Sequence, residues 1–575
     1  MFNEKLSKFQ KVKKNNIFRF TKEKSETHTS YIKEEISKDK NKYKNKSLKK
    51  LFNVNLIIIF MNVIILIFTP ISTSKKIVIR LLNNNNYIMI TIQGKGLQTL
   101  INENYISSLS SIKINEEEEI TENISNIQNL NFDLNIIQLK FNSQLNSCNE
   151  IFRNLLNITQ IDLTYFDFSL VKYMGSSFEG CNSVKSINFS NVNASNMETM
   201  RSIFRDCKSL ELVDFTNFKT KNIWDLGYMF SGCEKITSID LSCFETSELV
   251  IFSGAFSDCS VLEIINLDNI NTSKVEQMDS LFLNCYSLVS LNLNYFNTES
   301  VRSMNSIFAG CTSLTTLDLS NFKTPSLESM YAMFYNCNKL IYLDISNITT
   351  SKVTNMALLF GFCQSLTSLN LSHFYTPSLI NMEYMFQGCS LLEILDISNF
   401  NTEKVISMQG LFFNSKSLKS LYLINFNTSL VKSMEAMFSG CENLETLDLS
   451  SFNTESVTNM QGMFGYCEKL TSLDISNFNT PLLETIDYMF ANCLSLEILN
   501  ISNLNTSKVK NFGNLFWHCH SLANLNLSNF NTSTAIYMDN MFSACIKLEF
   551  LDLNNFFTPN LEHMETIFIN CESLK

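Results

Sequence analysis

A segment of 26 residues recurs along most of this chain without a change of register. The copy at Met434–Asn459 has the sequence MEAMFSGCENLETLDLSSFNTESVTN, and its cysteine, Cys441, defines position 0. Steps of 26 residues reach a cysteine in every copy from residue 181 to residue 571, except at Ser415. Position −3 is phenylalanine in each of these copies. Self-similarity at a fixed period of this length is the signature of a solenoid, in which each coil packs only on its neighbours.

The apolar positions of one copy predict a short strand followed by a short helix. Leu447 and Leu449, at +6 and +8, flank Asp448, so a strand here points its leucines inward and its aspartate outward. The next apolar residues are three or four positions apart, which indicates one face of a helix. They are Val457, Met460, Phe464 and Cys467.

Threonine and proline mark the expected start of each helix. Thr or a similar residue is found at +13 in almost every copy, and four of the five prolines directly follow it. Thr caps a helix by accepting a backbone N–H, and Pro fits the first helical turn. The residue before the cysteine is mostly Gly, Asn or Asp, which tolerate the left-handed conformation that closes a helix. We therefore expect an α/β solenoid with one short parallel strand and one short helix in each coil.

Two inward columns are expected to form the centre of the core. The phenylalanines at −3 should stack into a continuous buried ladder. Its candidate residues in the middle of the array are Phe308, Phe334, Phe360, Phe386, Phe412, Phe438 and Phe464. Fifteen of the seventeen cysteines share position 0, where a free thiol acts as a small buried apolar group. We expect buried thiols there, with occasional disulfide bridges between neighbouring coils as the alternative.

The outward column at +7 consists mostly of Asp and Asn, and it is the candidate binding face. Mixing Asn into the column limits the repulsion that a ladder of aspartates would create. The column either solvates an exposed sheet or forms a mildly acidic docking face for a ligand. The candidate binding residues are Asp214, Asp240, Asp318, Asp344, Asp396, Tyr422, Asp448 and Asp474.

No arrangement of residues predicts catalysis, a cofactor or a metal ion. The sequence has no Gly-rich phosphate loop, nucleophile elbow or zinc-binding helix motif. His518 and His520 flank Cys519, but adjacent residues point in different directions and Cys519 belongs to the inward column. We therefore expect no enzymatic activity and no bound cofactor.

The amino-terminal region differs in composition from the repeats. Residues 1–50 contain sixteen Lys and Arg and six Asp and Glu with little periodicity, which predicts a basic, disordered tail. Residues 51–70 carry no charge, and Leu51–Thr69 is long enough to span a hydrocarbon layer of ~30 Å. A signal-anchor or a cleaved secretory signal would both place the repeats outside the cell. Residues 71–147 lack the repeat, and we expect them to form a β-rich cap on a solenoid at 148–575.

The repeat also carries a family resemblance. Its phrase M-x-x-M-F-x-x-C-x-x-L-x-x-L-D-L-S-x-F-x-T resembles the BspA-type leucine-rich-repeat surface proteins of bacteria and protists. The resemblance covers about residues 148–575 and implies a surface-exposed binding or adhesion protein without catalytic activity. Position +11 departs from most leucine-rich repeats, because Phe stands where they place Asn.

We therefore expect a cell-surface recognition or adhesion protein whose solenoid binds an extracellular protein or glycan, and no nucleic acid. A structural coat or spacer without a specific ligand is the alternative function. Membrane anchoring through Leu51–Thr69 is the expected location, with secretion as the alternative. The array stops at Lys575, before the strand due in the last copy. We expect that the polypeptide continues, or that this end is buried by self-association.

Overall fold

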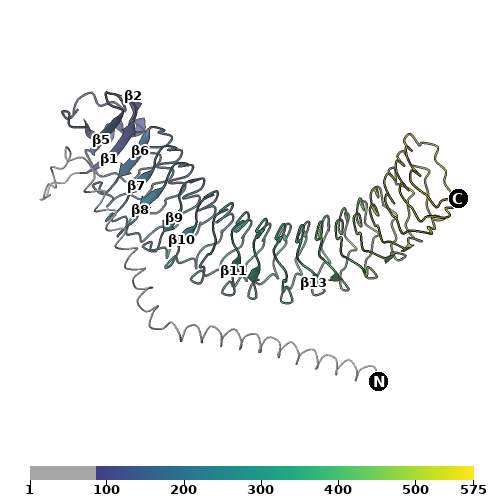
Figure 1. Ribbon diagram of the computed structural model, residues 1–575. Helices are drawn as coiled ribbons and strands as arrows, with labels where there is room; N and C mark the ends of the chain where they lie inside the picture. Colours follow the sequence, from purple (N-terminus) through teal and green to yellow (C-terminus); the bar gives the residue numbers. More distant parts are fainter. Residues whose placement is uncertain (1–85) are drawn as a thin grey trace, which may run out of the picture. The chain divides into compact units, whose positions relative to one another are not determined.

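The computed structural model describes residues 86–575, which form one stack of coils that is bowed along its length (Figure 1). Three expected segments lie outside the described residues, namely the tail at 1–50, the segment Leu51–Thr69 and the start of the cap at 71–85. Within 86–575, no helix is long and apolar enough to cross a membrane.

Short antiparallel strands precede the coils and pack against the first of them. The elements are β1 (Tyr87–Gln93), β2 (Gly96–Thr99), the 3-10 helix η1 (Glu103–Ser108), β3 (Leu109–Ile114), β4 (Ile127–Leu130) and β5 (Leu134–Phe141). On one side β1 pairs antiparallel with β5, and on the other it pairs with β6 (Ile158–Asp162), the first strand of the coils. β1 therefore covers an edge of β6 that would otherwise be open to pairing with another chain.

Most coils contribute a strand of three residues at +5 to +7, one residue earlier than the predicted strand. These strands are β7 (Ser186–Asn188), β8 (Leu212–Asp214), β9 (Ser238–Asp240), β10 (Ile264–Asn266), β11 (Thr316–Asp318), β12 (Tyr342–Asp344), β13 (Ile394–Asp396), β14 (Ser420–Tyr422), β15 (Ser472–Asp474) and β16 (Ile498–Asn500). Neighbouring strands are parallel and keep the 26-residue register, as in Leu317 opposite Leu343. The first sheet has the order β3-β5-β1-β6-β7-β8, and the later strands form separate pairs.

The prediction of a helix in each coil is wrong, because positions −8 to 0 form tight turns. We call the side of the stack formed by these positions the turn wall. In a representative coil, the N–H groups of Ser306, Phe308 and Gly310 donate to carbonyls of the next coil at 2.8–3.0 Å. The intervening N–H groups of Ile307 and Ala309 donate to carbonyls three residues earlier in the same coil. At −8, parallel backbone bridges run without a break from residue 147 to residue 563. No α-helix occurs anywhere in residues 86–575.

Left-handed backbone at two positions explains why the turn wall is not helical. Gly310, at −1, has a φ of 76°, and Ser306, at −5, has a φ of 54°. A right-handed helix cannot continue through a left-handed residue at every fourth position. The sequence indicated the first of these positions, but −5 also contains Leu358 and Tyr384 with positive φ, which side chains of this kind rarely adopt. Stacking adds a second reason, because helices need about 8–10 Å between axes and stacked strands only about 4.8 Å.

The threonines at +13 from Thr220 to Thr532 are buried, and they join neighbouring coils instead of capping helices. Thr272 Oγ1 accepts the backbone N–H of Asn297 at 2.8 Å and donates to the carbonyl of the same residue at 2.8 Å. Thr402 makes the same two hydrogen bonds with Asn427. Each hydroxyl therefore satisfies the backbone donor and the backbone acceptor of one residue in the next coil.

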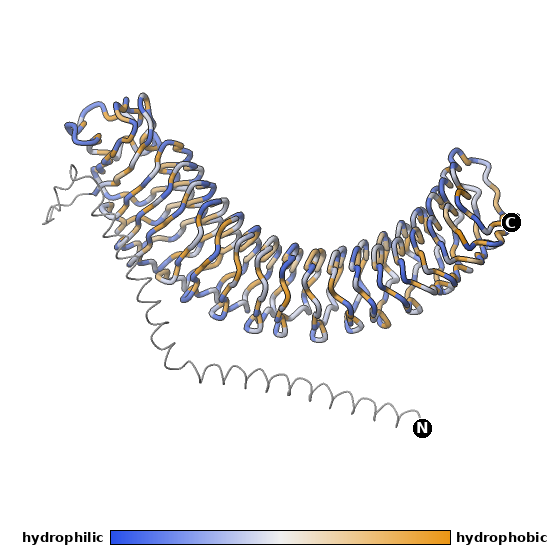
Figure 2. The backbone as a smooth tube through the Cα atoms, viewed as in Figure 1, coloured by the Kyte–Doolittle hydropathy of each residue, from blue (hydrophilic) through white to orange (hydrophobic). Residues whose placement is uncertain are grey.

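Stacked phenylalanines form the part of the core that lies beneath the turn wall. The seven candidate ladder residues from Phe308 to Phe464 are fully buried. Each of their rings stacks on the next, with 5.6–5.8 Å between centroids. Figure 2 shows that apolar stretches recur in every coil along the whole stack, as a continuous core of this kind requires.

The cysteines at position 0, apart from the half-buried Cys571, are buried thiols that donate hydrogen bonds along the stack. All seventeen cysteines are free, so the expected alternative of disulfide bridges does not occur. Cys311 Sγ donates to the carbonyl of Phe282 in the preceding coil at 3.3 Å. Ser415, the one exception in the column, makes the same bond through Oγ to the carbonyl of Phe386 at 2.7 Å. From residue 181 onward, position 0 is therefore held by a small side chain with a donor, whereas the first coil has Leu155 there.

Candidate binding face

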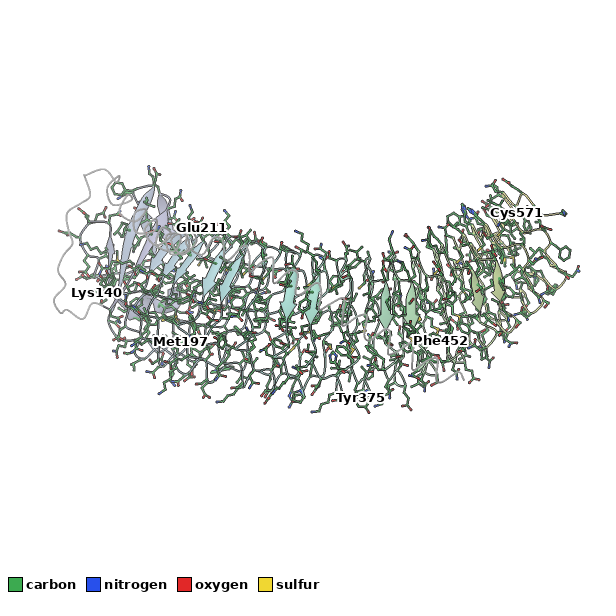
Figure 3. The ribbon with its side chains drawn as sticks, turned by 60° about the horizontal axis from the view of Figure 1, so that its bottom comes forward. Lys140, Met197, Glu211, Tyr375, Phe452 and Cys571 are labelled. Atoms are coloured by element: carbon green, nitrogen blue, oxygen red, sulfur yellow. The ribbon has the colours of Figure 1, made fainter. Side chains whose placement is uncertain are left out.

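The outward side chains at +5, +7 and +9 of successive coils form the surface that we call the strand face. Figure 3 shows the strands side by side along the stack, with side chains projecting from the coils. Glu211, at +4, and Tyr375, at +12, lie at opposite edges of the stack in this view (Figure 3). The strand and its exit turn therefore cross the width of a coil between these two edges.

The Asp and Asn side chains at +7 close the turn that follows each strand. Asp344 Oδ1 accepts the N–H of Ser346, two residues later, at 3.0 Å, which is an Asx turn. The other candidate aspartates that make this bond are Asp214, Asp240, Asp318, Asp396, Asp448 and Asp474. Asn370 makes it as well, so the turn needs the Oδ1 atom and not the charge. The sequence carried this signal, because Asp and Asn are the two residues that share that atom.

The Asx turns keep carboxylates of the strand face in their charged form. The backbone N–H of Ser450 lowers the pKa of Asp448, and that of Ser476 lowers the pKa of Asp474. A corresponding hydrogen bond lowers the pKa of Asp344. None of the seven candidate aspartates forms an ion pair with a Lys or Arg of residues 86–575. The strand face therefore presents carboxylates that no cation of the described chain neutralises.

The backbone register brings several candidate residues together on adjacent coils. The adjacent candidates are Asp318 opposite Asp344, Asp396 opposite Tyr422, and Asp448 beside Asp474, whereas Asp214 and Asp240 belong to different sheets. Asp448 and Asp474 line the same open hollow of about 390 Å³. Its other lining residues are Leu447, Leu449, Ser450, Ser476 and Asn477.

Large apolar side chains at +5 are a feature of the strand face that sequence reasoning missed. Six of them are exposed, namely Leu212, Ile264, Tyr342, Ile394, Ile498 and Phe550. The +5 residues between them are Ser, Thr or Asn, so no two of the six lie on adjacent coils. Single apolar side chains in polar surroundings are ordinary at protein surfaces.

One coil departs from this pattern by adding apolar side chains at two polar positions. Tyr422 replaces the Asp or Asn at +7, and Ile424 replaces the polar residue at +9. Their exposed fractions are 52% and 68%, and that of Ile394 in the preceding coil is 60%. Tyr422 lies opposite Asp396, two residues beyond Ile394, so Ile394 and Tyr422 are diagonal neighbours on adjacent strands. Ile424 follows two residues after Tyr422 in the same coil. We call Ile394, Tyr422 and Ile424 the apolar patch.

The histidines near the carboxyl-terminal end do not converge with the neighbouring thiol. Ring nitrogens of His518 and His520 lie 3.2 Å apart, and burial lowers the pKa of His518. The thiol of Cys519 instead donates to the carbonyl of Phe490 at 3.1 Å. Across the residues that the structure describes, no group of three or more His, Cys, Asp or Glu side chains is arranged to bind a metal ion.

Comparison with protein families shows where the repeat recurs. The family described as "Mycoplasma protein of unknown function, DUF285" matches residues 146–262, 250–374, 338–422, 417–499 and 485–575. These matches cover the repeat array from its first copy to its last. No curated protein matches the chain.

Three solved structures are similar to the chain at low identity. The TLR13–ssRNA13 complex matches at 18% identity and a TM-score of 0.22, with 73% of each chain covered. A leucine-rich-repeat protein of Leptospira interrogans matches at 13% identity and a TM-score of 0.20, covering 64% of this chain and 89% of that one. The Drosophila Toll–Spatzle complex matches at 15% identity and a TM-score of 0.20, covering 71% of this chain and 61% of that one.

Proposed function

Since the chain belongs to the family of Mycoplasma proteins of unknown function, DUF285, we propose a function from its own surface: the solenoid binds a macromolecule through the strand face, without catalysis. The observation that carries this proposal is the chemistry of that face. It displays carboxylates without cationic partners and, in several coils along the array, exposed apolar side chains. A long face of shallow relief suits a macromolecular partner better than a small substrate, which needs a concave site.

The location and the kind of partner belong to the same proposal. An uncharged segment at Leu51–Thr69 directly follows Lys49 and Lys50, which favours a membrane anchor with the basic tail inside the cell. The repeats would then face the exterior and act in cell-surface recognition or adhesion, as the BspA-type resemblance implies. The partner is an extracellular protein or a glycan, and secretion is the alternative location.

Binding can be tested on the full-length chain reconstituted in detergent. We expect saturable binding to at least one member of a panel of extracellular matrix proteins and glycans. The control is the variant Asp318→Asn, Asp344→Asn, Asp448→Asn, Asp474→Asn, which keeps the Asx turns and removes four charges from the strand face. No saturable partner, or binding that the variant leaves unchanged, would contradict the proposal. The absence of a saturable partner would favour a coat or spacer. The unbroken backbone bridges of the turn wall suit that role.

The location has a separate test on intact cells. Protease added outside should remove the repeats and leave a protected basic amino-terminal fragment of about fifty to seventy residues. Antibodies to the two ends of the chain distinguish this fragment from complete degradation. Repeats that become accessible only after the cells are permeabilised would contradict an exterior location.

A further inference from the structure

The apolar patch is unusual because nothing in the stacking of the coils requires it. Position +7 supplies an Asx acceptor in the other coils, and Tyr422 cannot provide that acceptor. Position +9 is polar in the other coils, whereas Ile424 is an aliphatic side chain with two-thirds of its surface exposed. An apolar group placed against the local pattern gains nothing for the fold. Such a side chain contributes favourable free energy only when a partner covers it.

A charged hollow lies directly beside the apolar patch. Asp448 and Ser450, which line the hollow, occupy in the next coil the same positions as Tyr422 and Ile424. Adjacent coils of the strand face are about 4.8 Å apart, so patch and hollow form one continuous surface. The hollow combines the carboxylates of Asp448 and Asp474 with an apolar wall from leucines. Such a lining fits the long apolar stem and charged head of a Lys or Arg.

We propose that the apolar patch and the adjoining hollow form a docking site for a protein segment that presents a Lys or Arg next to a large apolar side chain. The apolar side chain covers Tyr422 and Ile424, while the cationic head reaches Asp448 and Asp474. This inference rests on the proposed function and specifies where on the strand face the partner binds.

The acidic charge of the described residues indicates that the partner is basic. Residues 86–575 contain 49 Asp and Glu against 26 Lys and Arg. Beside the patch, Glu393 pairs with Lys419, whereas Asp448 and Asp474 form no ion pair with a Lys or Arg of the described residues. A basic segment is therefore attracted to the face and oriented on it. Aliphatic side chains such as Ile394 and Ile424 offer no hydrogen bonds to sugar hydroxyls. A protein segment with its own apolar side chain is thus the better fit than a glycan.

The test uses the full-length chain and a phage-displayed library of random peptides of about twelve residues, a length that can extend across several coils. Enriched peptides should contain Lys or Arg close to a large apolar residue. The first variant, Tyr422→Asp with Ile424→Ser, restores the residue types of the other coils and should fold normally. The second, Asp448→Asn with Asp474→Asn, keeps the Asx acceptors and removes both charges. Each should weaken peptide binding by ~tenfold or more, with unchanged thermal unfolding.

Matched controls separate this site from the rest of the strand face. Ile498→Ser removes an equally exposed apolar side chain elsewhere, and Asp318→Asn with Asp344→Asn removes another adjacent pair of charges. Both should leave peptide binding unchanged. If the controls weaken binding as much as the site variants, the strand face binds but the assigned site is wrong. If acidic peptides are enriched, or a glycan array gives binding that needs Tyr422 while the peptides do not bind, the partner chemistry is wrong.

Discussion

The two sides of each coil differ in how they are joined to the next coil. On the turn wall, backbone bridges at −8 run unbroken from residue 147 to residue 563, and every second N–H between −7 and −1 donates to the following coil. On the strand side, strands of three residues pair in separate groups. The continuous hydrogen bonding of the solenoid therefore lies on the turn wall, and the strand face can vary without breaking the stack.

This difference explains where the repeats tolerate change. From residue 181 onward, position 0 is small and donates a hydrogen bond, and −5 and −1 are left-handed in each described coil. The strand face instead accommodates Leu, Ile, Tyr, Phe, Ser, Thr and Asn at +5, and even Tyr422 in the Asx column. Variation on an exposed face over a repeated core suits a binding surface on a rigid support.

The largest expected difference between the turn wall and the strand face is a loss of stability in alkali. It arises because the turn wall contains a column of buried thiols. Burial raises the pKa of Cys337, Cys389 and Cys441 to about 12, against about 9 for an ordinary thiol. The protonated thiols contribute their full stability below about pH 9, and the unfolded chain ionises first above that value. Each such thiol therefore lowers the free energy of unfolding by up to about 1.4 kcal/mol per pH unit between about pH 9 and pH 12.

Thermal unfolding followed by circular dichroism between about pH 8 and pH 10 measures this loss. The control replaces Cys337, Cys363 and Cys389 by Ser, the residue that already serves at position 415. That variant should lose less stability over the same range. Asp344, Asp448 and Asp474 of the strand face contribute weakly and in the opposite pH range, because their pKa values are lowered, so they titrate in acid, and their charges are screened by solvent. Equal stability at both ends of the alkaline range would contradict the buried-thiol argument.

Truncation of the phenylalanine ladder should have the next largest effect. Phe334→Ala removes a fully buried ring that stacks on Phe308 and Phe360 at 5.8 and 5.7 Å. The free energy of unfolding should fall locally by ~3–5 kcal/mol, which hydrogen exchange of the neighbouring coils and urea unfolding both detect. Ile394→Ser, on the strand face, should change it by no more than about 0.5 kcal/mol. Comparable effects of the two substitutions would abolish the contrast between core and strand face.

The sequence predicted what is buried more accurately than how the backbone is bonded. Val457, Met460, Phe464 and Cys467 are all fully buried, as their spacing indicated. A spacing of three or four residues suits a helix and a series of tight turns equally well, since both return a side chain to the same side. The deciding feature was the left-handed conformation at −5. Some coils have Gly or Asn there, as at Gly410, but most have residues such as Ala436 that give no sign of it.

The candidate site shows the same limit. The exposure of the +7 column could be predicted from strand alternation, and the Asp–Asn restriction contained the Asx turn. The hollow beside Asp448 depends on how neighbouring coils stack, which no single repeat specifies. The +5 column was visible in the sequence as isolated large apolar residues at one phase. Its importance appears only once Tyr422 and Ile424 are placed beside Ile394.

Loss of a side-chain bond between coils should have an intermediate effect. Thr402→Val leaves the N–H and the carbonyl of Asn427 without the hydroxyl that satisfies both at 2.8 and 2.9 Å. The free energy of unfolding should fall by ~1–3 kcal/mol in urea titration, because two hydrogen bonds of about 0.5–1.5 kcal/mol each are lost. Thr402→Ser preserves the hydroxyl and should recover most of the loss. If Val and Ser are equivalent, these threonines act only by packing, and their hydroxyls do not help to join the coils.

The smallest predicted effect tests whether left-handed backbone defines the turn wall. Substitutions at two left-handed positions should change the stability in opposite directions. Gly440, at −1, has a φ of 76°, and an added Cβ would collide with Asn414 Oδ1. Gly440→Ala should therefore destabilise the coil by ~1–2 kcal/mol or more. Ala436, at −5, has a φ of 52°, so Ala436→Gly removes the strain of a left-handed alanine. The greater flexibility of glycine in the unfolded chain offsets part of that gain, which leaves a stabilisation of at most ~1 kcal/mol. Thermal unfolding of both variants decides the question. In a right-handed helix Ala436→Gly would destabilise by a similar amount, so the sign of this one substitution distinguishes a wall of turns from the helix that the spacing suggested.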